Sequence, residues 1–119
     1  MGDLSEHFSR WEFACRCGCG FDTVDAQLLQ VLQALRRAMG KPVSVHSGAR
    51  CARHNAELDP PGAPNSYHLC GQAADIEVDA KSNEEVGAWL RAYDIPLGVG
   101  IYKTHVHVDV RGWKADWSR

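Results

Sequence analysis

The sequence has 119 residues, of which 45% are hydrophobic and 24% are charged, and its formal net charge is -2. This length and composition fit one globular domain over residues 1–119 and exclude a disordered chain. The near-neutral net charge lacks the excess of basic residues that is typical of nucleic-acid-binding proteins, and no apolar run approaches the length of a membrane span. We therefore expect neither nucleic acid nor a membrane among the partners.

Apolar periodicity, together with glycine and proline, divides the chain into elements. We expect residues 1–21 to form an N-terminal clasp, in which Phe8, Trp11 and Phe13 pack on the domain ahead of a cysteine-rich loop. The other predicted elements are a helix over 23–39, a strand over 42–46, an irregular segment over 49–71, a strand over 73–78, a helix opened by Ser82, and a hairpin of strands 98–102 and 105–110. This order predicts an α+β fold with a small, mostly antiparallel sheet and helices packed on one face.

The two helices have recognisable start signals. Asp22 or Thr23 is the predicted cap of the first helix, and Ser82 with Glu85 forms a capping-box pattern at the second. Near the C-terminus, Trp113 and Trp117 are expected to close the domain edge or to line a cleft.

Polar residues gather in two of the predicted strands. Alternate side chains of a strand share a face, so His105, His107 and Asp109 point to one side of the last strand. Asp75 lies in the strand over 73–78, and His68 comes from the loop just before it. If these strands are neighbours, two imidazoles and one carboxylate converge, which is the ligand set of a catalytic zinc. Spacing alone leaves open the alternative of solvated or satisfied polar residues.

The segment Ser66–Asp75 fits the pattern S-x-H-x-x-G-x-A-x-D. Together with His105-Val106-His107, it resembles the zinc motifs of the M15-type D-Ala-D-Ala carboxypeptidases and of the small phage-like peptidases of the same family, which are related to hedgehog domains and lysostaphin-type peptidases. Ser47–Cys51 resembles the stretch that precedes this motif in the family. The resemblance covers nearly the whole chain. It implies the family's α+β fold, one catalytic Zn2+ and hydrolysis of peptidoglycan peptides by a carboxypeptidase or an endopeptidase of the endolysin type.

The resemblance also implies roles for individual residues. His68, Asp75 and His107 match the zinc ligands of the family. Arg50 matches an arginine that contacts the substrate carboxylate or carbonyl oxygen in family members.

The identity of the general base is an open question at this stage. Thr104 stands where many carboxypeptidase members have the acid that serves as base. His105 and Asp109 are the alternatives, because both share the face of His107, and the unperturbed pKa of a histidine suits the task better. Asp109 can instead orient a histidine. Glu77 is a further carboxylate, for which a solvated strand face is the favoured interpretation.

Two other functional classes remain open. One is a non-catalytic, zinc-stabilised binding module, which Thr104 favours modestly, and the other is a phage structural protein. The N-terminal residues lack a signal-peptide pattern, so we expect the protein to stay in the cytoplasm until release. We also expect a monomer that is encoded by a phage or prophage. Nothing in the sequence selects the peptide bond that is cleaved.

The sequence contains five cysteines, so at least one cannot pair within the chain. Cys15, Cys17 and Cys19 have three interpretations: a second metal site completed by Cys51, a disulfide to Cys51, or plain thiols. Their C-x-C-x-C spacing differs from the usual C-x2-C of zinc sites, so thiols or a disulfide are favoured over a second metal. Cys70 is expected to be a packing residue.

Overall fold

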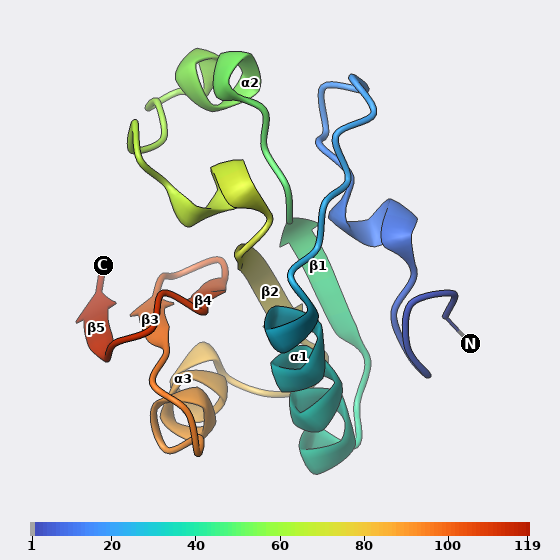
Figure 1. Cartoon of the computed structure of the whole chain (residues 1–119). Helices are drawn as coiled ribbons and strands as arrows, with labels where there is room; N and C mark the ends of the chain where they lie inside the picture. Colours follow the sequence, from blue (N-terminus) through green and yellow to red (C-terminus); the bar gives the residue numbers. More distant parts are fainter. Residues whose placement is uncertain (1) are drawn as a thin grey trace.

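The structure of the chain, a computed structural model, describes residues 2–119 (Figure 1). Its elements, with η for a 3-10 helix, are η1 Arg10–Phe13, α1 Ala26–Met39, β1 Val43–Ser47, α2 Ala52–Glu57, η2 Tyr67–Cys70, β2 Ala73–Val78, α3 Asn83–Arg91, β3 Gly98–Ile101, β4 Val106–Asp109 and β5 Ala115–Ser118. Every predicted helix and strand is present. None of the helices in residues 2–119 is long and apolar enough to cross a membrane.

The strands form one sheet in the order β1-β2-β4-β3-β5. Three of its neighbouring pairs, β1 with β2, β2 with β4 and β4 with β3, are antiparallel, whereas β5 runs parallel to β3. The predicted α+β fold with a mostly antiparallel sheet is therefore confirmed, and a parallel strand is added at one edge. The neighbouring strands β2 and β4 carry two of the candidate ligands, Asp75 and His107, and the third, His68, lies in η2.

One hydrophobic cluster joins the helices to one face of the sheet. The strands contribute Ala74, Ile76, Val106 and Val108, and the helices contribute Leu28, Val31, Leu32, Leu35, Val86 and Leu90. Because side chains alternate along β2 and β4, the opposite face is left for Asp75 and His107. The fold thus separates a packed face from a polar face at the centre of the sheet.

The first helix begins later than predicted, at Ala26 rather than Thr23. The oxygen Oδ1 of Asp25 accepts hydrogen bonds from the backbone nitrogens of Gln27 and Leu28, at 2.8 and 3.2 Å. Asp25 is therefore the cap, and the prediction of Asp22 or Thr23 is wrong. An aspartate in extended backbone conformation satisfies free N–H groups of the first turn, which fixes the start of the helix.

The segment over 49–71 is less irregular than predicted, because it contains α2 and η2. The sulfur of Cys51 caps α2 by accepting a hydrogen bond from His54 N at 3.4 Å. Cysteine is not among the residues preferred at this position, so a sequence-based search for helix starts passes over it.

The N-terminal residues pack on the domain in part as predicted. Phe8 and Phe13 are each only 1% exposed and belong to the central hydrophobic cluster, whereas Trp11 is 72% exposed, so its predicted packing is wrong. The backbone of Ala49 donates a hydrogen bond to Phe13 O at 2.8 Å. A Cβ atom on Gly48 would lie 2.7 Å from Phe13 Cα, so this close approach requires glycine. The N-terminal segment is thereby held against the chain that follows β1.

Candidate metal centre

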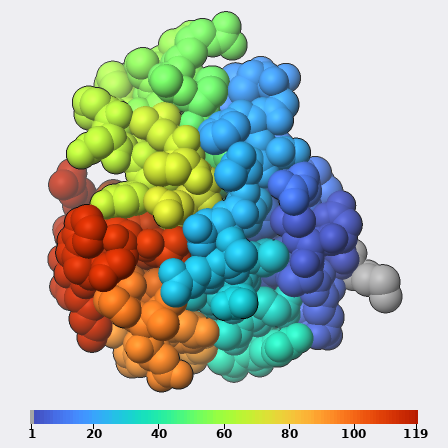
Figure 2. Space-filling model, in the orientation of Figure 1, coloured from blue at the N-terminus to red at the C-terminus, as the bar shows by residue number. Residues whose placement is uncertain are grey.

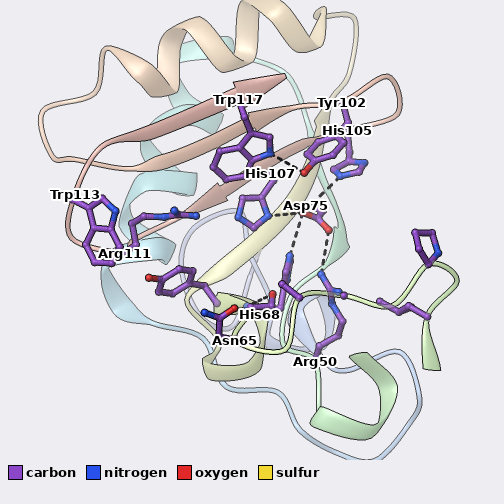
Figure 3. A pocket seen from close by; sticks show the side chains of 16 residues that line it. Arg50, Asn65, His68, Asp75, Tyr102, His105, His107, Arg111, Trp113 and Trp117 are labelled. Atoms are coloured by element: carbon purple, nitrogen blue, oxygen red, sulfur yellow. Dashed lines mark hydrogen bonds and ion pairs between the residues drawn. The ribbon is translucent and has the colours of Figure 1, made fainter. Parts of the chain in front are cut away.

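The register between β2 and β4 places Asp75 directly opposite His107. The distance from Asp75 Oδ1 to His107 Nδ1 is 3.1 Å. His68 reaches the same oxygen from η2, with its Nε2 at 3.2 Å. Figure 3 shows the three side chains converging in a cleft. The structure therefore brings together the three residues that the sequence singles out as metal ligands.

The outer nitrogen of each imidazole has its own acceptor. His68 Nδ1 lies 2.7 Å from the carbonyl oxygen of Gly48, and His107 Nε2 lies 2.7 Å from Asp109 Oδ2. A carbonyl or carboxylate oxygen can only accept, so these nitrogens carry the hydrogens. In neutral imidazoles, the lone pairs of His68 Nε2 and His107 Nδ1 then face Asp75. Such outer bonds fix the tautomer and orientation of metal-binding histidines.

This arrangement needs positive charge between its ligand atoms, from protons or from a metal ion. Two nitrogen lone pairs and a carboxylate oxygen, all within 4.8 Å of one another, repel unless protons or a metal ion lie between them. Two imidazoles with one carboxylate are the donors that a catalytic zinc site uses. The donor set of His68, Asp75 and His107 therefore fits a zinc ion.

The carboxyl group of Asp75 is held in its ionised form. Burial by itself would raise its pKa, but the hydrogen bonds to His107 and then His68 outweigh burial and hold the pKa well below its usual range. Burial lowers the pKa of His107, but the hydrogen bonds to Asp109 and Asp75 outweigh burial and raise it. The site is thus organised around negative charge that attracts a cation.

Asp109 lies behind the site rather than in the cleft. Its carboxyl group is fully buried, and besides His107 it accepts hydrogen bonds from Arg111, from Nε at 2.7 Å and from Nη2 at 2.8 Å. Burial would raise its pKa, but Arg111 and His107 lower the pKa to about 2. The carboxylate is therefore ionised at neutral pH, and both of its oxygens accept hydrogen bonds.

Arg50 lies beside the ligands and is almost buried. Its Nη1 donates to Asn55 Oδ1 at 2.9 Å, and its Nη2 lies 3.6 Å from Asp75 Oδ2. Its Nε is buried without a hydrogen-bond partner in the described chain. The backbone N–H of Arg50 donates to the carbonyl oxygen of His68 at 2.9 Å, which ties the arginine to the ligand loop.

His105 lies at the rim of the site. Its Nε2 is 3.9 Å from Asp75 Oδ1, and its Nδ1 is 2.9 Å from Thr104 Oγ1. The ring stacks on Tyr102 at 4.6 Å between centroids and 11° between planes. Burial lowers the pKa of His105, which Asp75 opposes. Glu77, in contrast, is exposed and lies 2.8 Å from His46 Nε2, outside the cleft.

The cleft has a volume of about 600 Å³. Besides the residues above, aromatic and cationic side chains line it: Tyr67, Tyr102, Arg111, Trp113 and Trp117. The sequence reasoning missed Arg111, although it continues the alternation of His105, His107 and Asp109 and so could have been found. It also missed Tyr102, which accepts a hydrogen bond from Trp117 Nε1 at 2.8 Å.

A family model for peptidase M15 matches residues 6–109. The chain belongs to the peptidase M15 family. The matched range contains His68, Asp75 and His107, the candidate metal ligands of this M15 member, and it ends at Asp109, before β5. The resemblance inferred from the motifs is thus confirmed. A search of curated proteins gives no match.

Proposed function

We propose that this M15 peptidase is a zinc-dependent hydrolase of peptidoglycan peptides, acting as a D,D-carboxypeptidase or an endopeptidase. The observation that carries the proposal is the convergence of His68, Asp75 and His107 in a cleft bordered by Arg50 and His105 (Figure 3). The substrate class rests on family membership and on the resemblance of the zinc motifs. The setting implied by that resemblance is a phage- or prophage-encoded monomer that reaches the cell wall at lysis.

Zinc bound by His68, Asp75 and His107 supplies a Lewis acid that polarises a carbonyl and lowers the pKa of water toward neutrality. The protein's part is to hold the ligand atoms in place. The carbonyl of Gly48 and the carboxylate of Asp109 fix the two imidazole rings through their outer nitrogens. Asp109 is therefore a positioning residue in this proposal, since it is buried outside the cleft and both of its oxygens accept hydrogen bonds from His107 or Arg111.

His105 is the proposed general base. Its Nε2 points toward Asp75, and Thr104 Oγ1 partners the other ring nitrogen, which fixes the ring. Because burial lowers its pKa, the imidazole is neutral at pH 7 and can accept a proton. This assignment accounts for Thr104 at the position where relatives have an acid: the threonine orients a base instead of being one.

Arg50 is the proposed contact for a substrate carboxylate or for the developing oxyanion. Arg50 lines the cleft, and its Nη2 makes only a long contact of 3.6 Å with Asp75 Oδ2, so the guanidinium has hydrogens left for a substrate oxygen. A guanidinium fork matches a carboxylate, and a fixed cation stabilises negative charge that develops on an oxygen.

Incubation of the zinc-loaded protein with purified sacculi and with soluble muropeptides, followed by mass spectrometry, tests the proposal. Loss of the terminal residue of a stem peptide identifies a carboxypeptidase, and loss of a cross-link identifies an endopeptidase. Full zinc occupancy with no change in any muropeptide would refute the enzyme and support a zinc-stabilised binding module instead. Glu77→Gln is the control, since it alters a carboxylate outside the cleft.

A further inference from the structure

A second cluster of metal-ligand side chains lies apart from the cleft. Cys15, Cys17 and Cys19 come from the loop after η1, and Cys51 comes from the N-terminus of α2. Their four sulfur atoms all lie within 4.8 Å of one another, and all five cysteines of the chain are free thiols. The fifth, Cys70, is exposed and is not part of this group. Figure 2 shows the blue N-terminal segment in contact with the green segment that contains Cys51.

The sulfur–sulfur distances fit a tetrahedral ion. They are 3.4 Å for Cys15 to Cys17, 3.7 Å for Cys17 to Cys51 and 3.9 Å for Cys15 to Cys51. With zinc–sulfur bonds of about 2.3 Å, the edge of a zinc–thiolate tetrahedron is about 3.8 Å. A disulfide requires about 2.05 Å. The three sulfurs thus have the spacing of metal ligands, and none of them lies at bonding distance from another.

The surrounding backbone favours thiolates. Cys51 N donates to Cys15 Sγ at 3.5 Å, and His54 N donates to Cys51 Sγ at 3.4 Å. Hydrogen bonds of this kind orient metal ligands and stabilise their charge. Gly18 and Gly20, with φ of 81° and 91°, give the loop the left-handed turns that allow three alternate cysteines to reach one point.

A positively charged side chain also lies near the negative charge expected of a metal–thiolate cluster. Four thiolates around a divalent ion leave a net charge of about two negative units. The guanidinium of Arg53 lies near Cys17 and Cys51, and its Nε lies 3.5 Å from Glu57 Oε1. The cluster therefore has a cation beside it that offsets part of this charge.

We propose that Cys15, Cys17, Cys19 and Cys51 bind a structural zinc ion, separate from the ion held by His68, Asp75 and His107. Four protein ligands close the coordination sphere and leave no position for water, which distinguishes a structural site from a catalytic one. Soft thiolates select zinc over hard cations. Binding releases the thiol protons and changes no oxidation state.

The proposed ion has a defined structural role. It joins the loop of residues 15–19 to Cys51, which directly follows Arg50 in the chain. The neighbouring contact from Ala49 N to Phe13 O, at 2.8 Å, runs between the same two segments. The ion thus cross-links the N-terminal segment to the part of the cleft that carries Arg50. Such a link between segments distant in sequence stabilises the fold by restricting the unfolded chain.

Metal content and cobalt spectra test the inference without reliance on catalysis. We expect two zinc ions per chain in the native protein and in the control variant Cys70→Ser. We expect one zinc ion per chain in the double variant Cys17→Ser/Cys19→Ser, and one in His107→Ala. Cobalt-loaded protein is expected to show thiolate-to-metal charge-transfer absorption in the native chain and in His107→Ala. The double serine variant should lose this absorption.

The inference would be overturned if the native protein contained one zinc ion per chain and His107→Ala contained none. So would an intact mass that shows disulfide formation together with no thiolate–cobalt absorption. If the double serine variant fails to fold, the native protein and His107→Ala still decide the question. Failure of this inference can be told apart from failure of the proposed function. A protein that binds the thiolate-coordinated ion but shows no hydrolytic activity would refute the proposed peptidase activity and leave the structural zinc site intact.

Discussion

The chain contains two clusters of metal-ligand residues that are built in different ways. His107 and Asp75 lie on paired strands of the sheet, where the register sets their separation. Cys17 and Cys19 lie on an N-terminal loop shaped by glycines. The sheet holds its site in place through packing that exists without any ion. The loop is held instead by individual contacts, such as those from Arg16 Nη2 to Glu12 O and Val45 O at 2.8 Å, so we expect the cysteine cluster to depend more on its ion for its shape than the site on the sheet does.

The largest expected effect comes from Asp75, the carboxylate of the site formed by His68, Asp75 and His107, which is called the sheet site below. Asp75→Asn removes the charge that faces both imidazoles, so the variant should lose the zinc of this site, and hydrolysis should fall to the level of the reaction without enzyme. Metal analysis and muropeptide assays measure both losses. Glu77→Gln, in the same strand and exposed, is the matched control. If Asp75→Asn also abolished thiolate–cobalt absorption, the two clusters would not be independent.

The next effect separates metal binding from proton transfer at the sheet site. His105→Ala should retain the zinc, because its ring lies at the rim, while the rate of hydrolysis falls by about 10²–10⁴-fold, the usual contribution of a general base. The pH profile of the residual activity should lose its acidic limb. His46→Ala, an exposed histidine paired with Glu77, is the control. Full activity in His105→Ala would show that another group accepts the proton.

A smaller effect is expected at Asp109, the buried carboxylate that orients the ring of His107. Asp109→Asn weakens the hydrogen bonds from His107 and Arg111 without removing a ligand, so zinc affinity should fall by about 10–100-fold. Competition with a chelator measures this affinity. Asp116→Asn, exposed in β5, should have no effect. Equal affinity in Asp109→Asn would mean that the sheet alone orients His107.

The sequence predicts the strand part of the site, Asp75 and His107, because its geometry follows from period-two alternation, whereas His68 comes from η2. Alternation puts His107 and Asp109 on one face, and the further requirement is that β2 and β4 are neighbours, which the structure confirms. The same rule extends to Arg111, which the sequence reasoning missed because the predicted strand ends at Val110. Local periodicity therefore suffices where ligands lie on regular strands.

The other features depend on contacts between distant parts of the chain. The strand β5 pairs in parallel with β3 and has only four residues, of which Trp117 is the one large apolar side chain, so its sequence is too short to show an alternation that distinguishes it from a loop. The gathering of Cys15 and Cys51 depends on the packing of Phe13 against Gly48, which spacing does not encode. This is why the sequence leaves the state of the cysteines open, whereas it predicts that His68, Asp75 and His107 converge.

The smallest effect on zinc binding by His68, Asp75 and His107 is expected at Gly48, where the N-terminal segment meets this site. The carbonyl oxygen of Gly48 accepts a hydrogen bond from His68, and the Cα of the same glycine packs against the backbone of Phe13. Gly48→Ala would place Cβ 2.8 Å from Phe13 O and 2.7 Å from Phe13 Cα, so one segment must shift. We expect a loss of about 1–3 kcal/mol in the free energy of unfolding, the usual cost of overpacking.

Urea denaturation of the zinc-loaded protein measures this loss, with Ser44→Ala, exposed in β1, as the control. Because strand register rather than the N-terminal segment positions Asp75 and His107, the loss of zinc affinity at the sheet site should be smaller in Gly48→Ala than in Asp109→Asn. The thiolate ion should be released more readily, since the shift separates the loop of residues 15–19 from Cys51. The reverse order of sensitivity would mean that the N-terminal segment, and not the sheet, holds the histidine site together.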